Sequence, residues 1–314
     1  MSELPRYCLA AGITQPKLLF IGGGNMASAL VNGCVTSGFA AQSDIAISCR
    51  SESTLEKWKC QGFEDVFTST SSMLKAYPHG IIVLAVKPQA RHDVIGSLLS
   101  DNISLTGCPL LISILAGVDE KLLEKELSAV GYSGPIIRLF PNTAVAIGSG
   151  ASIICAEPGV SDEMITLVKT FASKVGLCLR VDSRNFNAYG AISGSAPAWT
   201  KVPFEQVPVE RVTAMSQTAR TVLLHVYMFI ESLADGGVFA GCSRETALQL
   251  AAQTVMGAAE MVLESKEHPA ALKDKVCSPG GTTIAGLREL EKSGFRSAII
   301  EAVKAAADRA NSMQ

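Results

Sequence analysis

A glycine-rich turn near the start of the chain carries the strongest chemical signal in the sequence. The apolar run at residues 17–21 leads directly into the hexapeptide GGGNMA at residues 22–27. Between a strand and a helix, the first glycine of such a motif permits a tight turn, and the second lets the backbone approach a pyrophosphate. The helix amino terminus favours the negative charge. We therefore expect a dinucleotide site that uses Gly22, Gly24, Asn25 and Met26, although an ordinary glycine-rich turn can have the same spacing.

The end of the next apolar run indicates which dinucleotide binds. NAD enzymes normally place an acidic residue there, which bonds the ribose hydroxyls. This chain instead has Ser48, Cys49, Arg50 and Ser51. An arginine can bind a 2'-phosphate through two hydrogen bonds, whereas a carboxylate would repel it. We expect NADP as the cofactor, with NADPH preferred and NADH as the alternative, and we place Cys49 and Arg50 against it. Arg50 at a solvated helix start is the competing interpretation.

Other loops follow strand ends at the edge where open α/β sheets bind ligands. We expect cofactor contacts from these loops at Ser72, Ala85, Lys87, Pro88, Ala116 and Gly117. Lys87 can equally be a solvated loop lysine. Asn142 follows a later strand, and its amide can bond either a nicotinamide or its own turn.

A second signal lies in the C-terminal half, before an apolar-periodic helix. Ser278 has the residue type of an N-cap, Pro279 suits the first helical position, and Gly280 and Gly281 expose the amides of the first turn. A helix start of this kind favours a small carboxylate. An ordinary capped helix start is the alternative.

The residues named above lie in two parts of the chain that are predicted to fold differently. Short apolar runs alternate with helical stretches at residues 17–21, 45–48, 81–86, 110–113, 136–140 and 177–181. This pattern is typical of buried parallel strands and predicts the α/β class, with a Rossmann-type doubly wound sheet. After about residue 182 the apolar spacing is helical, at 243–265, 281–292 and 295–313. We expect a tail at 1–16, a dinucleotide-binding domain at 17–182 and an all-α domain at 183–314.

Composition excludes several classes of function. The 314 residues carry 27 Lys and Arg against 29 Asp and Glu, so nucleic acid and polybasic membrane contacts are not expected. The longest purely apolar run, residues 81–86, is too short to cross a bilayer. The nine cysteines are odd in number and form no CxxC pair, which favours buried thiols, a reducing compartment and no metal site. We expect a cytoplasmic protein, with mitochondrial import as an alternative that residues 1–16 do not signal.

Several motifs together resemble one family. The segments FIGGGNMASAL, LAVKPQ, SILAGV, RLFPNT, AISGSAPAW, ESLADGGV and KVCSPGGTT occur in the order of the landmarks of pyrroline-5-carboxylate reductases, from about residue 17 to 311. The resemblance implies reduction of 1-pyrroline-5-carboxylate to L-proline by hydride transfer from NAD(P)H, the last step of proline biosynthesis. It also implies that the all-α domain is a dimerisation domain, in homodimers that can assemble into larger rings.

The resemblance also implies roles for individual residues. Ser278 and the amides of Gly280, Gly281 and Thr282 would hold the substrate carboxylate. Thr283 would bond the ring nitrogen and relay a proton, so Thr283 and Ser278 are the expected catalytic residues. Ser193 and Ser195 would begin the helix that lies beneath the substrate.

One segment departs from the family pattern. Residues 200–225 separate Trp199 from Val226, which follow each other in relatives, and Pro203 and Pro208 are incompatible with an undistorted helix. The cost of these prolines favours a splice product or a retained intron over a looped-out insertion. The alternative function is therefore a non-catalytic homologue or aberrant isoform that binds cofactor. A hydroxyacid dehydrogenase would need a catalytic Lys or His, and the four histidines lie outside the motifs.

Overall fold

The chain forms two compact units. The computed structural model describes residues 2–190, 192–193 and 217–311, and the units divide between Asn187 and Ala188. This division lies shortly after the boundary that we expected near residue 182. Each unit is described by itself below.

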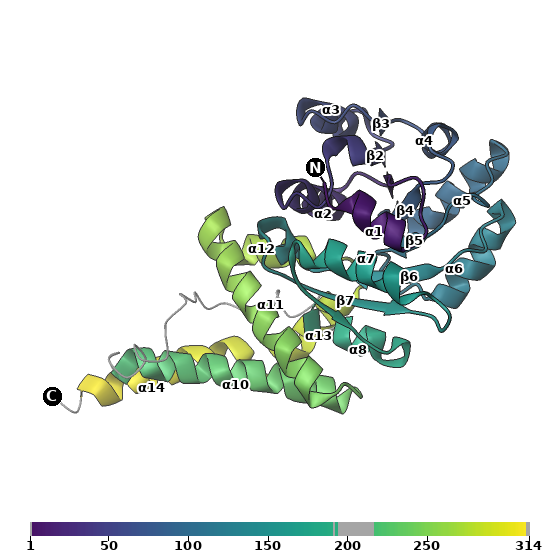
Figure 1. Cartoon of the computed structure of the whole chain (residues 1–314). Helices are drawn as coiled ribbons and strands as arrows, with labels where there is room; N and C mark the ends of the chain where they lie inside the picture. Colours follow the sequence, from purple (N-terminus) through teal and green to yellow (C-terminus); the bar gives the residue numbers. More distant parts are fainter. Residues whose placement is uncertain (1, 191, 194–216, 312–314) are drawn as a thin grey trace. The chain divides into compact units, whose positions relative to one another are not determined.

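The first unit contains one sheet of eight strands (Figure 1). The strands are β1 (Leu18–Ile21), β2 (Ile45–Ser48), β3 (Val66–Phe67), β4 (Ile81–Leu84), β5 (Leu111–Ser113), β6 (Ile136–Phe140), β7 (Gly150–Ala156) and β8 (Gly176–Arg180). Their order is β3-β2-β1-β4-β5-β6-β7-β8, and only the β6–β7 pair is antiparallel. The predicted α/β fold with a Rossmann-type sheet is confirmed. Sequence reasoning did not identify β3 or β7.

The strand order reverses direction between β1 and β4, which is where open α/β sheets bind ligands. From β1 the chain moves outward to β2 and β3, and it then returns to the other side of β1 at β4. Ile21 pairs in register with Ser48 on one side and with Leu84 on the other. The loops after β1, β2 and β4 therefore start at one edge of the sheet, side by side.

Helices cover both faces of this sheet (Figure 1). Phe20 packs into one core and its neighbours Leu19 and Ile21 into the other, as the alternation of a strand requires. The first core includes side chains from α1 (Leu4–Ala10), α2 (Asn25–Thr36), α3 (Glu52–Cys60) and α7 (Asp162–Ser173). The second includes side chains from α4 (Thr70–Ala76), α5 (Arg91–Ser100) and α6 (Glu120–Leu127). Short 3₁₀ turns lie at Gln42–Asp44, Pro88–Ala90, Ser128–Val130, Thr143–Ile147 and Ser183–Asn185.

The expected tail at 1–16 is wrong, because most of this segment is part of the first unit. Leu4 and Cys8 of α1 are fully buried. The amide of Leu4 donates to the carbonyl of Phe39 over 2.7 Å. Glu3 forms an ion pair with Lys174 at 2.9 Å. The sequence signal was weak because the short helix α1 buries only two side chains, Leu4 and Cys8.

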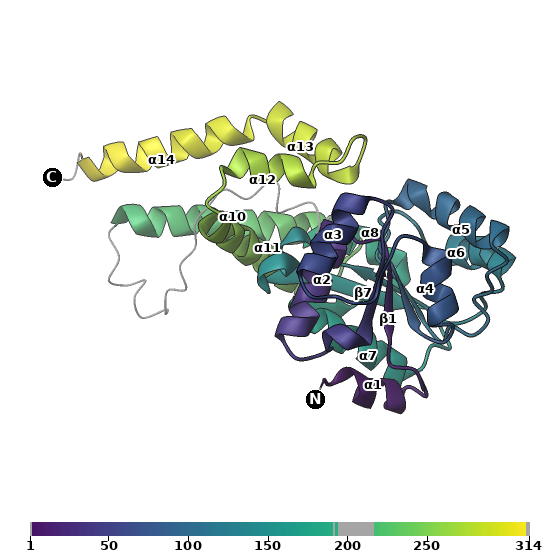
Figure 2. The same ribbon diagram turned by 90° about the horizontal axis from the view of Figure 1, so that it is seen from above.

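The second unit is helical throughout the part that the structure describes, which confirms the predicted all-α domain (Figure 2). Short α8 (Phe186–Gly190) lies at the division between the units, and five further helices follow: α10 (Gln217–Phe239), α11 (Arg244–Ser265), α12 (Pro269–Val276), α13 (Thr282–Lys292) and α14 (Phe295–Asn311). Helix α10 packs against α11 and α14. Of the anomalous segment 200–225, residues 217–225 belong to α10, and the rest, with both prolines, lies outside the described residues. Among the described helices none is both long and apolar enough to span a bilayer.

Candidate functional site

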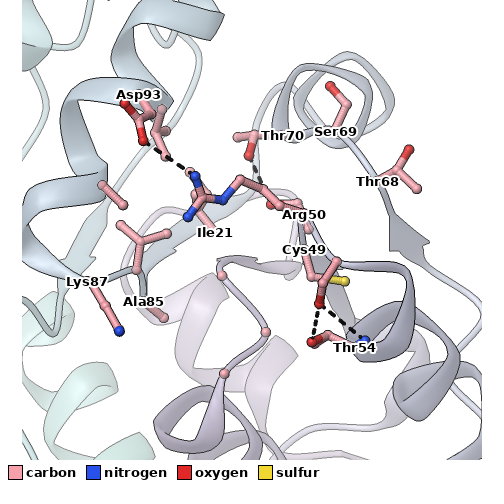
Figure 3. Close-up of a pocket in the computed structure, with 18 of the residues that line it drawn as sticks. Ile21, Cys49, Arg50, Thr54, Thr68, Ser69, Thr70, Ala85, Lys87 and Asp93 are labelled. Carbon is pink, nitrogen blue, oxygen red and sulfur yellow. Dashed lines mark hydrogen bonds and ion pairs between the residues drawn. The ribbon is translucent and has the colours of Figure 1, made fainter.

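A cavity of about 680 Å³ opens at the sheet edge where the strand order reverses (Figure 3). Ligand pockets generally have volumes of about 300–1,000 Å³. The loops after β1, β2 and β4 line it, together with the segment around the start of α4 and the first half of α5. The cavity therefore lies where the glycine-rich turn and the Arg50 loop were expected to meet.

Gly22, in the loop after β1, contacts both of the other loops that line this cavity. Its φ is +107°, a left-handed conformation that side-chain-bearing residues rarely adopt. A Cβ at this position would lie 2.5 Å from the carbonyl oxygen of Ala85 in the loop after β4. Its amide donates to the carbonyl of Ser48, at the end of β2, over 2.9 Å. Only glycine fits where the three loops meet.

Trp58 packs against the same glycine-rich turn and donates a hydrogen bond to it. The sequence analysis did not identify this residue. The indole is fully buried on α3, and its Nε1 donates to the carbonyl of Gly23 over 3.1 Å. A Cβ on Gly23 would lie 2.6 Å from that nitrogen. A buried tryptophan usually finds a partner for its N–H, and the apolar pair Leu55 and Trp58 on one helix face was the available signal.

Gly24 opens α2 at the floor of the cavity. It is the N-cap of the helix, and a Cβ here would meet nothing within 4 Å. The first amides of a helix have no partners within it, and together with the dipole they favour a phosphate. Asn25, which is exposed, and Met26, which is half-buried, form the first turn. These features fit the pyrophosphate of a dinucleotide.

Polar side chains surround the opposite end of the cavity. Arg50 and Asp93 point toward each other, with 3.4 Å between guanidinium and carboxylate, while Lys87 points away from them (Figure 3). The hydroxyls of Ser48 and Thr70 lie 3.1 Å apart. Ser51 caps α3, and Ser69 caps α4.

Cys49 also lines the cavity and is 7% exposed. Burial raises the pKa of its thiol. A protonated thiol is a weak nucleophile, so Cys49 contributes surface to the site and no covalent chemistry.

The loop after β4 is held from outside the cavity by Arg91. Its guanidinium donates to Glu126 at 2.8 and 3.0 Å and to the carbonyl of Pro88 at 2.8 Å. The Arg91 and Glu126 side chains are 14% and 17% exposed. Sequence reasoning identified neither residue, because no motif marks a pair that acts through a neighbouring loop.

The structure brings some of the predicted cofactor residues together and leaves others aside. Of the predicted set, the following line the cavity: Gly22, Gly24, Cys49, Arg50, Ala85 and Lys87. Ser72 is exposed and is not among the described lining residues. Ser69, whose hydroxyl accepts from the Ser72 amide, lines the cavity instead. Pro88, Ala116 and Gly117 are likewise not among the lining residues that the structure describes.

Asn142 makes a contact that the sequence analysis did not consider, to a strand beyond its own turn. The side chain is 2% exposed, and its Oδ1 accepts from the amide of Ala151 on β7 over 3.1 Å. It is not among the described lining residues of the cavity.

In the second unit, Ser278 and Gly281 form a tight turn before α13. The helix begins at Thr282 with Gly281 as its N-cap, so the prediction of a Ser278 cap with Pro279 at the first helical position is wrong. A Cβ on Gly281 would lie 2.2 Å from the Ser278 hydroxyl oxygen, and the Gly281 amide donates to the Ser278 carbonyl over 3.1 Å. Gly280 has a φ of +66°. The Ser278 hydroxyl thus lies at the start of α13. The Gly281 amide is bonded to the Ser278 carbonyl and is therefore not available to a substrate carboxylate.

The remaining predicted residues are less accessible. Thr283, in the first turn of α13, is 7% exposed. Ser193 is fully buried, and its hydroxyl donates to the carbonyl of Tyr189 over 3.3 Å. Ser195 lies outside the described residues.

An apolar groove, also of about 680 Å³, lies within the second unit. Most of its lining comes from α10, α13 and α14, including Met228, Phe229, Leu290, Phe295 and Ile299. Met228 is 56% exposed. Exposed apolar surface of this kind marks an interaction site.

Comparison with family models divides the chain much as the structure does. The model described as pyrroline-5-carboxylate reductase dimerisation matches residues 207–313. The model described as NADP oxidoreductase, coenzyme F420-dependent, matches residues 17–117.

Individual relatives match nearly the whole chain. A putative pyrroline-5-carboxylate reductase 4 of Caenorhabditis elegans is 42% identical over 307 residues, covering 94% of this chain and 92% of the relative. The pyrroline-5-carboxylate reductase of Pisum sativum is 36% identical and covers 94% of both chains. The structure of the Coxiella burnetii enzyme aligns with a TM-score of 0.52 at 29% identity, covering 95% and 98%. That of the Plasmodium falciparum enzyme with NADP bound gives 0.50 at 30%, covering 95% and 97%.

Proposed function

The chain belongs to the pyrroline-5-carboxylate reductase family, and from this premise we propose that it reduces 1-pyrroline-5-carboxylate to L-proline with NADPH. This reaction is the last step of proline biosynthesis. The observation that carries the proposal is similarity over 94% of the chain to pyrroline-5-carboxylate reductases, at 42% and 36% identity. The cavity at the sheet edge adds physical support, because its walls fit a dinucleotide.

The cofactor-binding residues act on the two charged parts of NADPH. Gly22 and Gly24 let the backbone approach the pyrophosphate at the start of α2, and Arg50 binds the 2'-phosphate. Cys49, Ala85 and Lys87 complete the walls in this proposal, and Asn25 and Met26 lie beside the pyrophosphate in the first turn of α2. The bound cofactor supplies the hydride.

The residues of the second unit hold and polarise the substrate. The Ser278 hydroxyl and the positive end of α13 bind the carboxylate, which places the imine for reaction. The Thr283 hydroxyl bonds the ring nitrogen, where a proton must be held while the imine carbon accepts hydride. Ser193 supports this region by fixing the end of α8 through the Tyr189 carbonyl.

The active assembly is a homodimer in which a second copy of the chain covers the apolar groove of the second unit. The match to the dimerisation model and the exposed apolar side chains of α10 and α14 support this assembly. Dimers of this kind associate further into rings. Nucleic acid and membranes are not partners of a chain whose net charge is −2.

The cytoplasm is the proposed location. All nine cysteines are free. Burial raises the pKa of Cys108 to about 11, and burial together with the nearby Asp44 charge raises that of Cys8 to about 12. Unpaired, buried thiols suit a reducing compartment.

The decisive experiment measures NADPH oxidation in the presence of 1-pyrroline-5-carboxylate, for the chain as it stands and for a version without residues 200–225. Turnover by the intact chain supports the proposal. Turnover only by the shorter version would assign the loss to that segment, and no turnover by either version would contradict the proposed reaction.

The role of Thr283 needs its own variants. Thr283→Val keeps the shape and removes the hydroxyl, so it should lower kcat, whereas Thr283→Ser should retain most of it. An unchanged rate in Thr283→Val would refute the hydrogen bond to the ring nitrogen.

A further inference from the structure

Asp93 faces Arg50 across the cofactor cavity, and this pair carries an inference about cofactor choice. Arg50 follows β2 on one wall, and Asp93 lies in the first turn of α5 on the other. Their side chains approach to 3.4 Å (Figure 3). No family motif and no sequence signal pointed to Asp93.

We propose that Asp93 is a specificity-determining residue that competes with the cofactor 2'-phosphate for Arg50, and thereby limits the preference for NADPH over NADH. The inference rests on the proposed function, which places the 2'-phosphate at Arg50. It concerns a residue outside every segment that carries the family resemblance.

The first step is that Arg50 is the cation available at this end. The described lining contains two basic side chains, Arg50 and Lys87, and Lys87 points away from the Arg50–Asp93 pair (Figure 3). The nearby hydroxyls of Ser51 and Ser69 cap α3 and α4. A phosphate at this end must therefore draw Arg50 away from Asp93.

The second step is that the phosphate wins this competition at a small cost. The Arg50 and Asp93 side chains are 80% and 71% exposed, so the pair is weak. A phosphate has a second charge and more acceptor oxygens than a carboxylate, and it binds the guanidinium at two points. Once displaced, the Asp93 carboxylate remains in the first turn of α5, where the helix dipole favours it.

The third step is that only NADPH binding requires the Arg50–Asp93 ion pair to break. NADPH must open the Arg50–Asp93 pair before its phosphate can bind Arg50. NADH has a hydroxyl at the same position and leaves the pair intact. Asp93 therefore weakens NADPH binding and leaves NADH binding unchanged.

Direct binding tests this without relying on turnover. Dissociation constants for NADPH and NADH are measured by isothermal titration calorimetry on the full chain, on Asp93→Asn and on Asp101→Asn. Asp101 is exposed at the end of the same helix and does not line the cavity, so it matches the charge change. We expect Asp93→Asn to tighten NADPH binding about two- to fivefold, as suits an exposed pair, with NADH unchanged and with neither cofactor affected in Asp101→Asn.

A background without Arg50 separates competition from simple repulsion. In Arg50→Met, the further change Asp93→Asn should no longer favour NADPH. The inference is overturned if Asp93→Asn changes both cofactors equally, if Asp101→Asn reproduces its effect, or if the effect persists without Arg50. An unaltered chain that bound neither nucleotide would overturn the cofactor site itself, and this inference with it.

Discussion

The cofactor cavity of the first unit and the helices of the second unit differ in how many of their surfaces are covered by other residues of the same chain. Around the cavity, hydrogen bonds join Gly22 to Ser48 and Trp58 to Gly23, and Arg91 holds the loop after β4 through the Pro88 carbonyl. In the helical unit, several large apolar side chains of α10 and α14 are exposed, among them Leu224, Tyr227, Met228, Phe239 and Ile300. Residues of the first unit alone line the described cavity, whereas the second unit presents apolar surface that suits a partner.

This contrast separates two sources of stability. Buried polar contacts hold the first unit, so losing one partner leaves an uncompensated group in a low-dielectric interior. The described ion pairs of the second unit lie nearer to solvent, and the proposed dimer would bury its exposed apolar side chains. Substitutions can test whether the stability of the first unit depends on buried polar contacts and the assembly of the second unit on its exposed apolar side chains.

The largest effect should come from the buried ion pair of Glu120 and Arg138. Both residues are 4% exposed, their charged groups lie 3.4 Å apart, and the guanidinium lies 4.0 Å from the centre of the Phe186 ring. Arg138→Met should lower the free energy of unfolding of the first unit by about 3–5 kcal/mol in urea titrations. Arg244→Met breaks an exposed pair in the second unit and should cost less than about 1 kcal/mol. Equal losses would remove the contrast.

Assembly should respond strongly to a charge in the apolar groove. Met228→Glu places a carboxylate on a surface that the second copy covers, and we expect the dimer to dissociate about 100-fold more readily, or about 3 kcal/mol. Sedimentation equilibrium measures the change. Leu9→Glu is the control, because Leu9 is 79% exposed on the first unit and is expected to leave the dimer intact. A Met228→Glu chain that stayed dimeric would contradict the proposed interface.

Cofactor binding should depend on the shape of Gly22. Gly22→Ala adds a Cβ 2.5 Å from the Ala85 oxygen in a left-handed conformation, and NADPH affinity should fall about 30-fold, or about 2 kcal/mol. Gly38→Ala also adds a Cβ at a positive φ, +74°, but with open space around it and outside the described cavity lining, so it is the control for a side chain added to a left-handed glycine. Titration calorimetry on both variants decides: similar losses of affinity would mean that the close approach to Ala85 does not matter.

The loop after β4 should respond more mildly to Arg91→Lys. A lysine cannot hold Glu126 at two points and also donate to Pro88, so the KM for NADPH should rise about fivefold, or about 1 kcal/mol, with kcat changed less. Arg180→Lys, in an exposed pair on the same unit, should leave both constants unchanged. A fall in kcat with an unchanged KM would exclude the proposed positioning role.

The smallest effect concerns pH. Burial raises the pKa of the Asp65 carboxyl, but hydrogen bonds from Lys17 and Tyr77 outweigh it and hold the pKa below the ordinary 3.8. The stabilisation is therefore complete above pH 3.8 and is lost as the pH falls through the lower folded-state value. Thermal unfolding across this acid range should show a shallower pH dependence in Asp65→Asn than in the unaltered chain. Asp101→Asn should keep the original slope.

Sequence reasoning reached most of the sheet because buried parallel strands have a simple pattern. Strands β2 and β6 occupy their predicted bounds, and β1, β4, β5 and β8 differ by a residue or two. Strand β7 was missed because its first half, Gly150, Ala151 and Ser152, consists of small residues with little strand character. Helix α1 was missed because it buries only Leu4 and Cys8.

The candidate site was predictable where backbone shape dictates the residue. Gly22 and Gly24 follow from the turn that a strand and helix must share, and Arg50 follows from its place after β2. Trp58, Arg91 and Asp93 each contact a residue more than 30 positions away, namely Gly23, Glu126 and Arg50, so no local spacing marks them. The N-cap of α13 was misplaced because Ser278 reaches Gly281 through a turn that residue types alone do not reveal.

The hydrogen bond of Trp58 also gives the chain an internal optical reporter. The sequence holds two tryptophans, Trp58 and Trp199, so Trp199→Phe leaves one indole, whose N–H is bonded to the cofactor turn. Its emission overlaps the absorption of reduced nicotinamide, and energy transfer would quench it when the cleft fills. The contact that fixes the turn thus makes occupancy of the cleft measurable by fluorescence, without a label and without substrate.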